Sequence, residues 1–332
     1  MSTEFELIEK ISQTFKRPEG VSVGIGDDCA VLDPGRFDLV TVDTLVEGIH
    51  FRSDWASPEE IGWKALATNL SDVAAMGGGP GAFFLSLSLP APLDVPWVEG
   101  LLAGMKAAAM ELVPDSFEVS LAGGDLTESK GPRIISITLL GEASPAGPVL
   151  RKGAVPGDQI VLIGSTGLSE GGLKVVEEGL DKKAYAALVE CYHRPRPNLK
   201  AGALLGLYGI PSAMLDVSDG LLADLGHLMK ASKVGARITG HKVPRHPELE
   251  ALEKAGYGNA LQRAISGGED FALLLTVPPS RMPKLWDLAN QNDWKAIDIG
   301  EVRSPDEGLT VSGLDGEPLK IEKTGFRHFE ES

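Results

Sequence analysis

The sequence predicts a two-domain α+β protein, and three observations lead to this fold class. The chain has 332 residues, about twice the length of a typical domain. Segments with strand-like and helix-like patterns are mixed in both halves, which is typical of α+β domains. The stretch from 141 to 156 is rich in glycine and proline. We therefore place a domain boundary there, and expect one domain at 1–145 and a second at 146–332.

The first half carries clear signals for the start and end of helices. Thr3 and Glu6 form a capping-box pattern at the start of an expected helix, in which apolar residues recur at helical spacing. Ser57 and Glu60 repeat this pattern with a proline between them, and the glycines at 77–79 end that helix. We expect, in order, a glycine-rich turn at 20–28, a strand at 37–43, a helix at 57–76, a strand at 82–89, a helix at 96–112, and strands at 117–122 and 133–140.

The second half alternates short apolar runs with longer amphipathic stretches. Short runs rich in Val, Ile and Leu indicate buried strands, and longer stretches with apolar residues every three or four positions indicate helices. There is no short-period repeat and no low-complexity tract. We expect strands at 159–163, 213–217, 271–277 and 296–302, and helices at 168–178, 183–192, 198–207 and 220–231.

The charge of the chain argues against some partners. The formal net charge is −16 at pH 7, whereas nucleic acids and anionic membranes bind basic surfaces. A phosphorylated substrate remains compatible, because carboxylates bind divalent cations and these cations bind phosphates. An acidic surface that only keeps the protein in solution explains the bulk of the charge equally well. We therefore expect neither nucleic acid nor a membrane as a partner.

The cysteines and the N-terminal segment predict a cytoplasmic protein. Cys29 and Cys191 have no cysteine or histidine neighbours at zinc-binding spacing, so we expect free thiols. Residues 1–10 are acidic and amphipathic, unlike a signal peptide. No apolar run approaches the roughly 18 residues that a membrane-spanning helix needs.

Five acidic motifs carry the candidate chemistry. Each alone is a weak signal, because aspartate is common in turns and helix caps. Together they indicate cation binding, since clustered carboxylates repel one another unless cations join them, and oxygen ligands favour magnesium or calcium over zinc. Their spacing does not show that they converge in space. The motifs are Gly-Ile-Gly-Asp-Asp (24–28), Thr-Val-Asp (41–43), Asn-Leu-Ser-Asp (69–72), Gly-Gly-Asp (123–125) and Asp-Val-Ser-Asp-Gly (216–220).

One of these aspartates lies within an expected helix. Lys64, Thr68 and Asp72 form a polar row at every fourth residue, with apolar residues around them. A carboxylate in such a row is costly to bury unless a positive charge meets it. A bound cation and Lys64 itself are both possible partners.

No standard nucleotide-binding loop is present. The sequence has no Gly-x-x-x-x-Gly-Lys-Ser/Thr, no complete dinucleotide fingerprint and no protein-kinase catalytic loop. If the chain uses ATP, it therefore has another fold.

The motifs resemble the thiamine-monophosphate kinase family nearly from end to end and in the same order. The combination is specific, because the pattern around His50 and the C-terminal aromatic tail are not general features of the wider superfamily. The segments that carry the resemblance are Gly-Ile-Gly-Asp-Asp-Cys-Ala (24–30), Asp-Thr-Leu-Val-Glu-Gly-Ile-His-Phe (43–51), Lys-Ala-Leu-Ala-Thr-Asn-Leu-Ser-Asp-Val-Ala-Ala-Met-Gly (64–77), Asp-Val-Ser-Asp-Gly-Leu (216–221), Gly-Gly-Glu-Asp-Phe (267–271) and Gly-Phe-Arg-His-Phe (325–329).

The resemblance implies an aminoimidazole-ribonucleotide synthetase-like fold. In it, an N-terminal domain dimerises through its sheet, and a C-terminal α+β domain closes a cleft that binds ATP and several Mg²⁺ ions. It implies a homodimer that phosphorylates thiamine monophosphate to thiamine diphosphate. It also implies Asp28, Thr41, Asp43, Asp72, Asp125, Asp216 and Asp219 as metal ligands, Gly124, Asp125, Arg151 and Ser218 as ATP contacts, and His50, Glu269 and Phe326 as contacts to thiamine monophosphate.

Three positions depart from the family pattern. Val42 replaces a hydroxyl residue, so that only its carbonyl group is available to a metal, and Leu102 replaces a tyrosine near the nucleotide. Phe326 replaces a tryptophan but keeps an aromatic face. Such a face, together with the anion of Glu269, attracts a cationic thiazolium ring.

The expected reaction needs no general base. The acceptor monophosphate has a second pKa near 6 and is mostly a dianion at pH 7. The barrier is repulsion between phosphates, since two unit charges 4 Å apart cost about 4 kcal/mol at an effective dielectric constant of 20. We therefore expect direct in-line transfer in which metal ions and Arg151 offset this charge.

Two kinds of rival function are weighed against this one. The first kind is another enzyme of the superfamily. Related selenophosphate synthetases carry a reactive cysteine or selenocysteine in the N-terminal segment, whereas residues 1–20 of this chain lack cysteine. Hydrogenase-maturation relatives end in a functional cysteine, whereas this sequence ends in Phe-Glu-Glu-Ser (329–332). The other rival is a non-catalytic regulator that binds nucleotide or metal. Retention of every acidic motif speaks against a regulator, and a turnover assay would distinguish the two.

Overall fold

The computed structural model describes residues 21–23, 29–32, 37–319 and 324–326. The helix expected near the N-terminus, residues 24–28 of the expected glycine turn, including Asp28, and the end of the aromatic tail at 327–329 lie outside these residues. Residues 21–23 of that turn form a strand instead. Within them, two six-stranded sheets account for the two halves of the chain. The α+β fold class is confirmed. The exact division at 145/146 stays a prediction.

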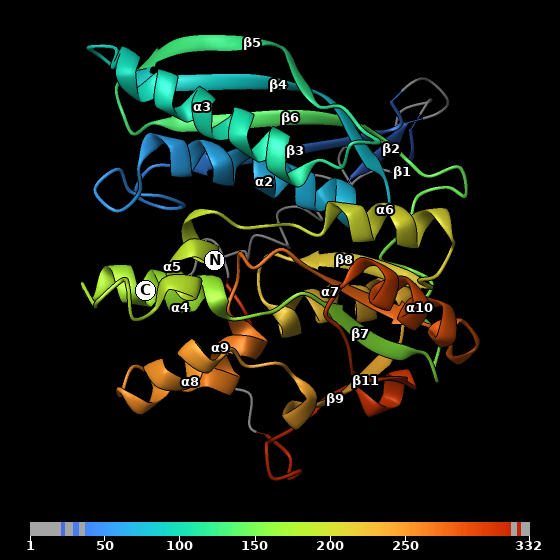
Figure 1. The fold of residues 1–332 in the computed structure, drawn as a ribbon. Helices are drawn as coiled ribbons and strands as arrows, with labels where there is room; N and C mark the ends of the chain where they lie inside the picture. The colour runs from blue at the N-terminus through green and yellow to red at the C-terminus, as the bar shows by residue number, and fades with distance from the viewer. Residues whose placement is uncertain (1–20, 24–28, 33–36, 320–323, 327–332) are drawn as a thin grey trace.

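Among the described residues, helices cover one face of the first sheet (Figure 1). Its strand order is β1-β2-β3-β6-β4-β5, and all neighbours are antiparallel except the parallel pair β4 and β5. The bounds are β1 Val21–Val23, β2 Ala30–Leu32, β3 Leu39–Val46, α2 Pro58–Ala75, β4 Gly79–Pro90, α3 Val95–Leu112, β5 Ser120–Ser129 and β6 Ile134–Glu142.

The second sheet has the order β12-β9-β11-β7-β10-β8 and contains one parallel pair, β12 with β9. Its central strands β7 and β10 and its edge strand β8 are almost wholly buried, because elements cover both of their faces. The bounds are β7 Gln159–Ile163, α4 Leu168–Glu177, α5 Ala186–His193, α6 Leu199–Leu207, β8 Ala213–Val217, α7 Leu221–Ser232, β9 Gly235–Thr239, α8 Pro247–Lys254, α9 Ala260–Ser266, β10 Ala272–Val277, α10 Met282–Asn292, β11 Ala296–Arg303 and β12 Leu309–Ser312.

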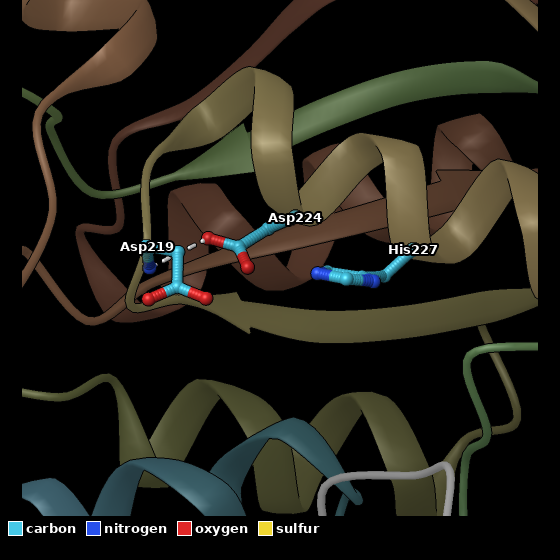
Figure 2. Close-up of side chains that lie close together, drawn as sticks. All are labelled: Asp219, Asp224 and His227. Atoms are coloured by element: carbon cyan, nitrogen blue, oxygen red, sulfur yellow. Dashed lines mark hydrogen bonds between the residues drawn. The ribbon is translucent and has the colours of Figure 1, made fainter. Parts of the chain in front are cut away.

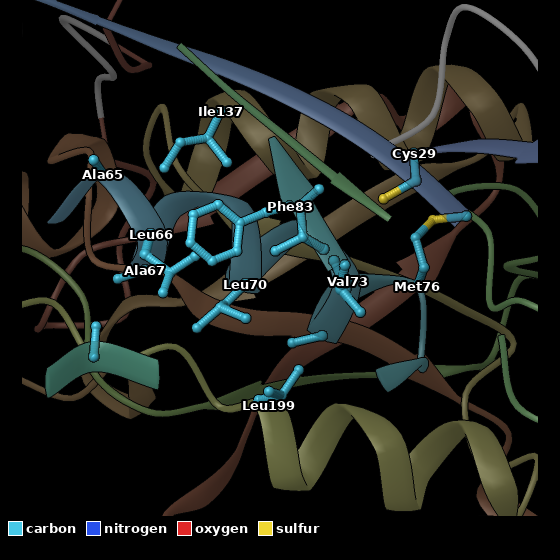
Figure 3. Packing of buried hydrophobic residues seen from close by; sticks show 14 of the residues in the cluster. Cys29, Ala65, Leu66, Ala67, Leu70, Val73, Met76, Phe83, Ile137 and Leu199 are labelled. Atoms are coloured by element: carbon cyan, nitrogen blue, oxygen red, sulfur yellow. The ribbon is translucent and has the colours of Figure 1, made fainter. Parts of the chain in front are cut away.

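Helix α2 begins as the sequence predicts and is buried on nearly every side. Ser57 caps it, and the side chains of Ser57 and Glu60 complete a capping box. Its apolar residues pack in a cluster with residues of the first sheet and of α6, including Leu199 (Figure 3). Because one helix joins both halves, polar residues on it can face the second domain.

Glycines allow the neighbouring helices to approach α2 closely. A Cβ atom at Gly62 would overlap the carbonyl oxygen of Leu101 in α3, and one at Gly202 in α6 would overlap that of Ala74. Such contacts bring backbones together where a side chain would separate them. The position of α2 is therefore fixed from both domains.

Besides β1 and β2, which were not anticipated, two parts of the chain differ from the sequence-based expectation. The strand expected at 117–122 is β5 at Ser120–Ser129. It runs along the edge of the sheet and is exposed, so its sequence of glycines and polar residues has no apolar–polar alternation. Its bounds are set by the hydrogen-bonded pairing with β4. Beyond residue 231, β9, α8, α9, α10 and β12 were not anticipated, because their short segments lack a long apolar period.

Among the described residues, no helix has the length and apolar character needed to cross a lipid bilayer.

The contact between α2 and α3 gives a stability prediction. A Cβ atom at Gly104 would overlap the carbonyl oxygen of Glu59, whereas one at Gly226 in α7 meets nothing within 4 Å. We expect Gly104→Ala to lower the free energy of unfolding by about 1–3 kcal/mol through overpacking. The matched variant Gly226→Ala should be neutral or raise it by up to about 1 kcal/mol through helix propensity. Denaturant unfolding of both variants measures this, and equal effects would contradict the close packing.

Candidate active site

A cavity of about 460 Å³ lies between the two halves. Its wall includes β3 and the loop after it from the first half, and the N-terminus of α4, the loop after β8 and the loop before β10 from the second. It brings together six residues that the sequence predicts for the site. These are Asp43, His50, Ser218, Asp219, Glu269 and Phe326.

Three predicted metal ligands meet where β3 faces α2. The hydroxyl group of Thr41 donates a hydrogen bond to Oδ2 of Asp72. Burial raises the pKa of Asp43 to about 6, and a hydrogen bond with Asp72 opposes this rise. The Oδ2 atom of Asp43 is buried and has no hydrogen-bond partner in the part of the chain that the structure describes. An unpaired buried carboxylate oxygen is costly, and an oxygen-binding cation such as Mg²⁺ would satisfy it.

A third aspartate reaches this region, from the other domain. Asp216 on β8 is buried, and its Oδ2 atom accepts a hydrogen bond of 2.6 Å from the hydroxyl group of Ser71 on α2. Ser71 precedes Asp72 in the chain. The carboxylates of Asp72 and Asp216 therefore lie on the two sides of the boundary between the domains.

The start of α7 adds two acidic residues (Figure 2). Oδ2 of Asp224 accepts hydrogen bonds from the backbone N–H groups of Ser218, Asp219 and Gly220 at 3.0, 3.1 and 3.0 Å. Burial, followed by the charges of Asp219 and Asp216, raises the pKa of Asp224 well above its usual range. These hydrogen bonds fix the loop that presents Ser218 and Asp219 to the cavity.

Asp219 and Asp224 also lie near a histidine. Ligand atoms of Asp219, Asp224 and His227 all lie within 4.8 Å of one another (Figure 2). Asp224 and His227 are three residues apart on one helix, so that their side chains share a face. Sequence reasoning missed both, although this spacing within the expected helix was a visible signal.

The Gly-Gly-Glu-Asp-Phe segment has a constrained backbone. Glu269 and Phe271 have φ angles of 61° and 51°, a region that non-glycine residues rarely adopt. Their N–H groups donate to the carbonyl oxygens of Ser218 and Val217 at 2.7 and 2.9 Å. This loop turns Glu269 towards the cavity.

The next residue, Asp270, is buried and turns away from the cavity. Its carboxylate accepts hydrogen bonds from Gly167 and Ser169 at the N-terminus of α4. Burial raises the pKa of Asp270 to about 7, and these backbone hydrogen bonds oppose the rise. Asp270 therefore ties α4 to the loop that carries Glu269.

Lys64 links the two domains through residues that line the cavity, although it does not line the cavity itself. Its ammonium group donates to Oε2 of Glu269 at 2.6 Å and to the carbonyl oxygen of His50 at 3.3 Å. It also lies 4.9 Å from the ring centroid of Tyr192. The polar row on α2 is thus divided, because Lys64 faces Glu269 whereas Asp72 faces Thr41 and Asp43.

The tail residues that the structure describes are docked beside Asp219. The N–H group of Phe326 donates to the carbonyl oxygen of Asp219 at 2.8 Å, and that of Ala223 donates to Thr324 at 3.1 Å. The side chain of Phe326 lines the cavity.

Six predicted ATP or metal contacts among the described residues are absent from the cavity wall. Thr41, Asp72 and Asp216 form the hydrogen bonds described above, and the other three lie elsewhere. Arg151 lies in the connection before β7, where its carbonyl oxygen accepts a hydrogen bond from Ser232. Gly124 and Asp125 lie on the exposed edge strand β5. Gly124 shares a row with Leu85, Ile137 and Asp43 across the sheet. At about 4.8 Å per strand, three strand spacings separate Gly124 from Asp43 by about 14 Å.

The cavity wall also contains residues that sequence reasoning did not single out. Ser169 and Glu170 lie in the first turn of α4. Gly164 and Gly167 precede them, and a glycine turn before a helix is a known signal for an anion-binding N-terminus. Thr68, in contrast, was noted only as part of the polar row, and it lines the cavity next to Asp43.

Comparison with known proteins identifies relatives over the whole chain. Residues 26–143 match the family model for the AIR synthase related protein, N-terminal domain, and residues 155–312 match the model for its C-terminal domain. The chain is 37% identical to thiamine-monophosphate kinase of Salmonella typhimurium, over 98% of each chain. It is 32% identical to that of Bacillus subtilis, over 98% of this chain and 99% of the relative.

Solved structures agree with these relatives. The structure of AaThiL complexed with AMPPCP and TMP superposes with a TM-score of 0.83 and 34% identity, over 98% of this chain and 97% of that one. The hydrogenase maturation protein HypE in complex with ATP has a TM-score of 0.70 but only 20% identity, over 89% of this chain and 88% of that one. The latter likeness shows the fold alone.

The raised pKa of Asp43 gives a prediction about the metal-free protein. The pKa of Asp43 in the folded state, about 6, lies above the ordinary value of 3.8. Between these two pH values the folded state therefore binds more protons than the unfolded state. The folded state loses stability as the pH rises through this range. We expect Asp43→Asn to melt at a higher temperature than the unmodified chain at pH 8 in EDTA, and at a similar one at pH 4. Thermal melts at both pH values measure this.

The same melts with magnesium test the assignment of Asp43 as a ligand. Excess Mg²⁺ at pH 8 should raise the melting temperature of the unmodified chain more than that of Asp43→Asn, because a ligand stabilises the state that binds it. An equal response to Mg²⁺ would contradict the assignment.

Proposed function

The chain belongs to the thiamine-monophosphate kinase family of AIR synthase related proteins, and we propose on this premise that it transfers the terminal phosphoryl group of ATP to thiamine monophosphate. The observation that carries the proposal is the shared cavity. Aspartates suited to metal–phosphate binding and three candidate acceptor contacts line one space of about 460 Å³. A cavity of this size suits the reacting ends of two small substrates.

The proposed metal ligands among the described residues are Thr41, Asp43, Asp72, Asp216 and Asp219, with Asp125 from the edge strand; Asp28 completes the set from outside the described residues. The unpartnered Oδ2 atom of Asp43 supports this assignment, and so do the raised pKa values of Asp43 and Asp224. Bound Mg²⁺ ions would screen the repulsion between the phosphates and align them for direct in-line transfer.

The protein groups then position the substrates and exclude competing water. Ser218 is proposed to contact ATP, and its loop is fixed by Asp224. Arg151 is proposed to contact the donor phosphates, a role for which its guanidinium group is suited. No general base is assigned, because the acceptor phosphate is mostly a dianion at pH 7.

The acceptor is proposed to lie between His50, Glu269 and Phe326. Nδ1 of His50 accepts a hydrogen bond of 3.1 Å from the N–H group of Val46. This leaves Nε2 of a neutral imidazole as the N–H donor, which suits a phosphate oxygen. Glu269 and the half-exposed ring of Phe326 offer an anion and an aromatic face to the cationic thiazolium ring.

We also propose that the chain acts as a homodimer through the free face of the first sheet. Val42 and Phe84 are 59% and 41% exposed on the strands β3 and β4, and exposed apolar patches commonly mark interfaces. Val42 points outward, so its side chain suits this contact better than metal binding. Since Gly124 and Asp125 lie far from Asp43 within one chain, we propose that they serve the site of the partner subunit.

Product analysis tests the proposed reaction directly. With ATP and Mg²⁺, we expect the protein to convert thiamine monophosphate to thiamine diphosphate and to leave free thiamine unchanged, because a neutral hydroxyl group needs a general base and no described residue is assigned that role. Chromatography of both reactions measures this. Comparable turnover of free thiamine would contradict the proposed acceptor.

Phe326 tests the placement of the acceptor. We expect Phe326→Ala to raise the Michaelis constant for thiamine monophosphate several-fold, which corresponds to a loss of about 0.5–2 kcal/mol in cation–π contact. The Michaelis constant for ATP should barely change. Phe326→Trp is the control and should be neutral or mildly favourable, since it keeps a larger aromatic face. Equal effects of Phe326→Ala on both substrates would mean that the tail is structural.

A further inference from the structure

Lys64 is a buried charge for which the proposed reaction has no use. Its side chain is only 5% exposed, and it does not line the cavity. Burying an ammonium group is costly unless it is paired and hydrogen-bonded. The partners that satisfy it are therefore informative about its role.

These partners are the residues that face the acceptor end of the cavity. Oε2 of Glu269 lies 2.6 Å from Nζ of Lys64, and the carbonyl oxygen of His50 lies 3.3 Å from it. His50 belongs to the first domain and Glu269 to the second, 205 residues from Lys64. A single ammonium group thus fixes two cavity-lining residues relative to each other.

The backbone of Glu269 leaves its side chain dependent on this contact. Its φ angle of 61° is held by its N–H bond to Ser218, which fixes where the side chain starts but not where the carboxylate points. The side chain is 34% exposed, so without Lys64 it is free to turn into water. One carboxylate oxygen is bound to Lys64, and the group therefore presents its other oxygen to the cavity.

We propose that Lys64 is a positioning residue that sets the specificity of the acceptor end. It orients the carboxylate of Glu269 and the loop of His50 towards thiamine monophosphate without contacting the substrate itself. The proposal rests on the proposed function, since it assigns these two residues to the acceptor.

Removing Lys64 also has an electrostatic effect that opposes the expected loss of affinity for thiamine monophosphate. Lys64 repels a cationic ring, so its removal also makes the acceptor end more negative and more attractive to thiazolium. Lys64 lies behind the lining carboxylate, so this repulsion acts over a longer distance than the attraction by Glu269. Loss of orientation is therefore expected to outweigh the gain in charge.

The experiment compares Lys64→Met with an interdomain control, with thiamine monophosphate and ATP as the varied substrates. We expect Lys64→Met to raise the Michaelis constant for thiamine monophosphate about ten-fold, the usual scale for losing a charged hydrogen bond, and to change that for ATP less than two-fold. Arg196→Met removes an exposed ion pair of 3.0 Å between the domains, with Glu111, and also a cation–π contact with the ring of Trp63, the residue before Lys64. It should leave both constants unchanged, which separates positioning from general loosening of the interface.

Thermal melts of a double-mutant cycle provide an independent reading. Glu269→Gln leaves the buried Lys64 without its counter-charge and should lower the melting temperature. Lys64→Met leaves a carboxylate that can reach water and should lower it less. The double variant should recover stability relative to Glu269→Gln. Its Michaelis constant for thiamine monophosphate should exceed that of Glu269→Gln only by the loss of the contact with His50, an increment smaller than the effect of Lys64→Met alone.

The outcomes separate the two proposals. If the unmodified chain forms no thiamine diphosphate, the proposed function is overturned and this inference with it. If the unmodified chain is active but Lys64→Met keeps or lowers its Michaelis constant for thiamine monophosphate, only the role of Lys64 is overturned. An equal rise for both substrates, or the same effect from Arg196→Met, would also overturn it.

Discussion

The structure depends on one helix, α2, that both domains bury. Apolar residues of α2 pack against the first sheet, and glycines bring α3 and α6 against its backbone. The same helix turns Lys64 and Ser71 towards the second domain, Thr68 towards the cavity and Asp72 towards Thr41 on β3. A helix that is packed on several sides cannot rotate or slide without creating clashes. These polar groups therefore keep a fixed position relative to β3 and β8. The cavity is a consequence of this arrangement.

Electrostatics then explains why the site is suited to cations and phosphates. Asp43, Asp72 and Asp216 come from three different elements, and Asp219 and Asp224 from the start of α7. Burial raises the pKa of both Asp43 and Asp224, and for Asp224 the charges of Asp219 and Asp216 raise it further. Proteins keep such clusters where function requires them. The acceptor end is different, because there the carboxylate of Glu269 is already paired with Lys64.

Much of the fold and part of the site could be predicted from the sequence. Helix α2 has a capping box, a long apolar period and a glycine stop, so its bounds were predicted closely. Strand β5 was misplaced because an exposed edge strand has no alternation to detect. The pairing of Lys64 with Glu269 could not be predicted, since it joins residues far apart in the chain. For the same reason, spacing could not reveal that Gly124 and Asp125 lie three strands away from Asp43.

We propose that the donor and acceptor phosphates meet at the aspartates between the two domains. A crystal structure with Mn²⁺, a non-hydrolysable ATP analogue and thiamine monophosphate would locate this meeting point. We expect anomalous manganese peaks beside Asp43 and Asp72, the two phosphate groups facing each other across them, and the thiazolium ring between Glu269 and Phe326. Manganese sites away from these aspartates, or an acceptor bound outside the cavity, would contradict it.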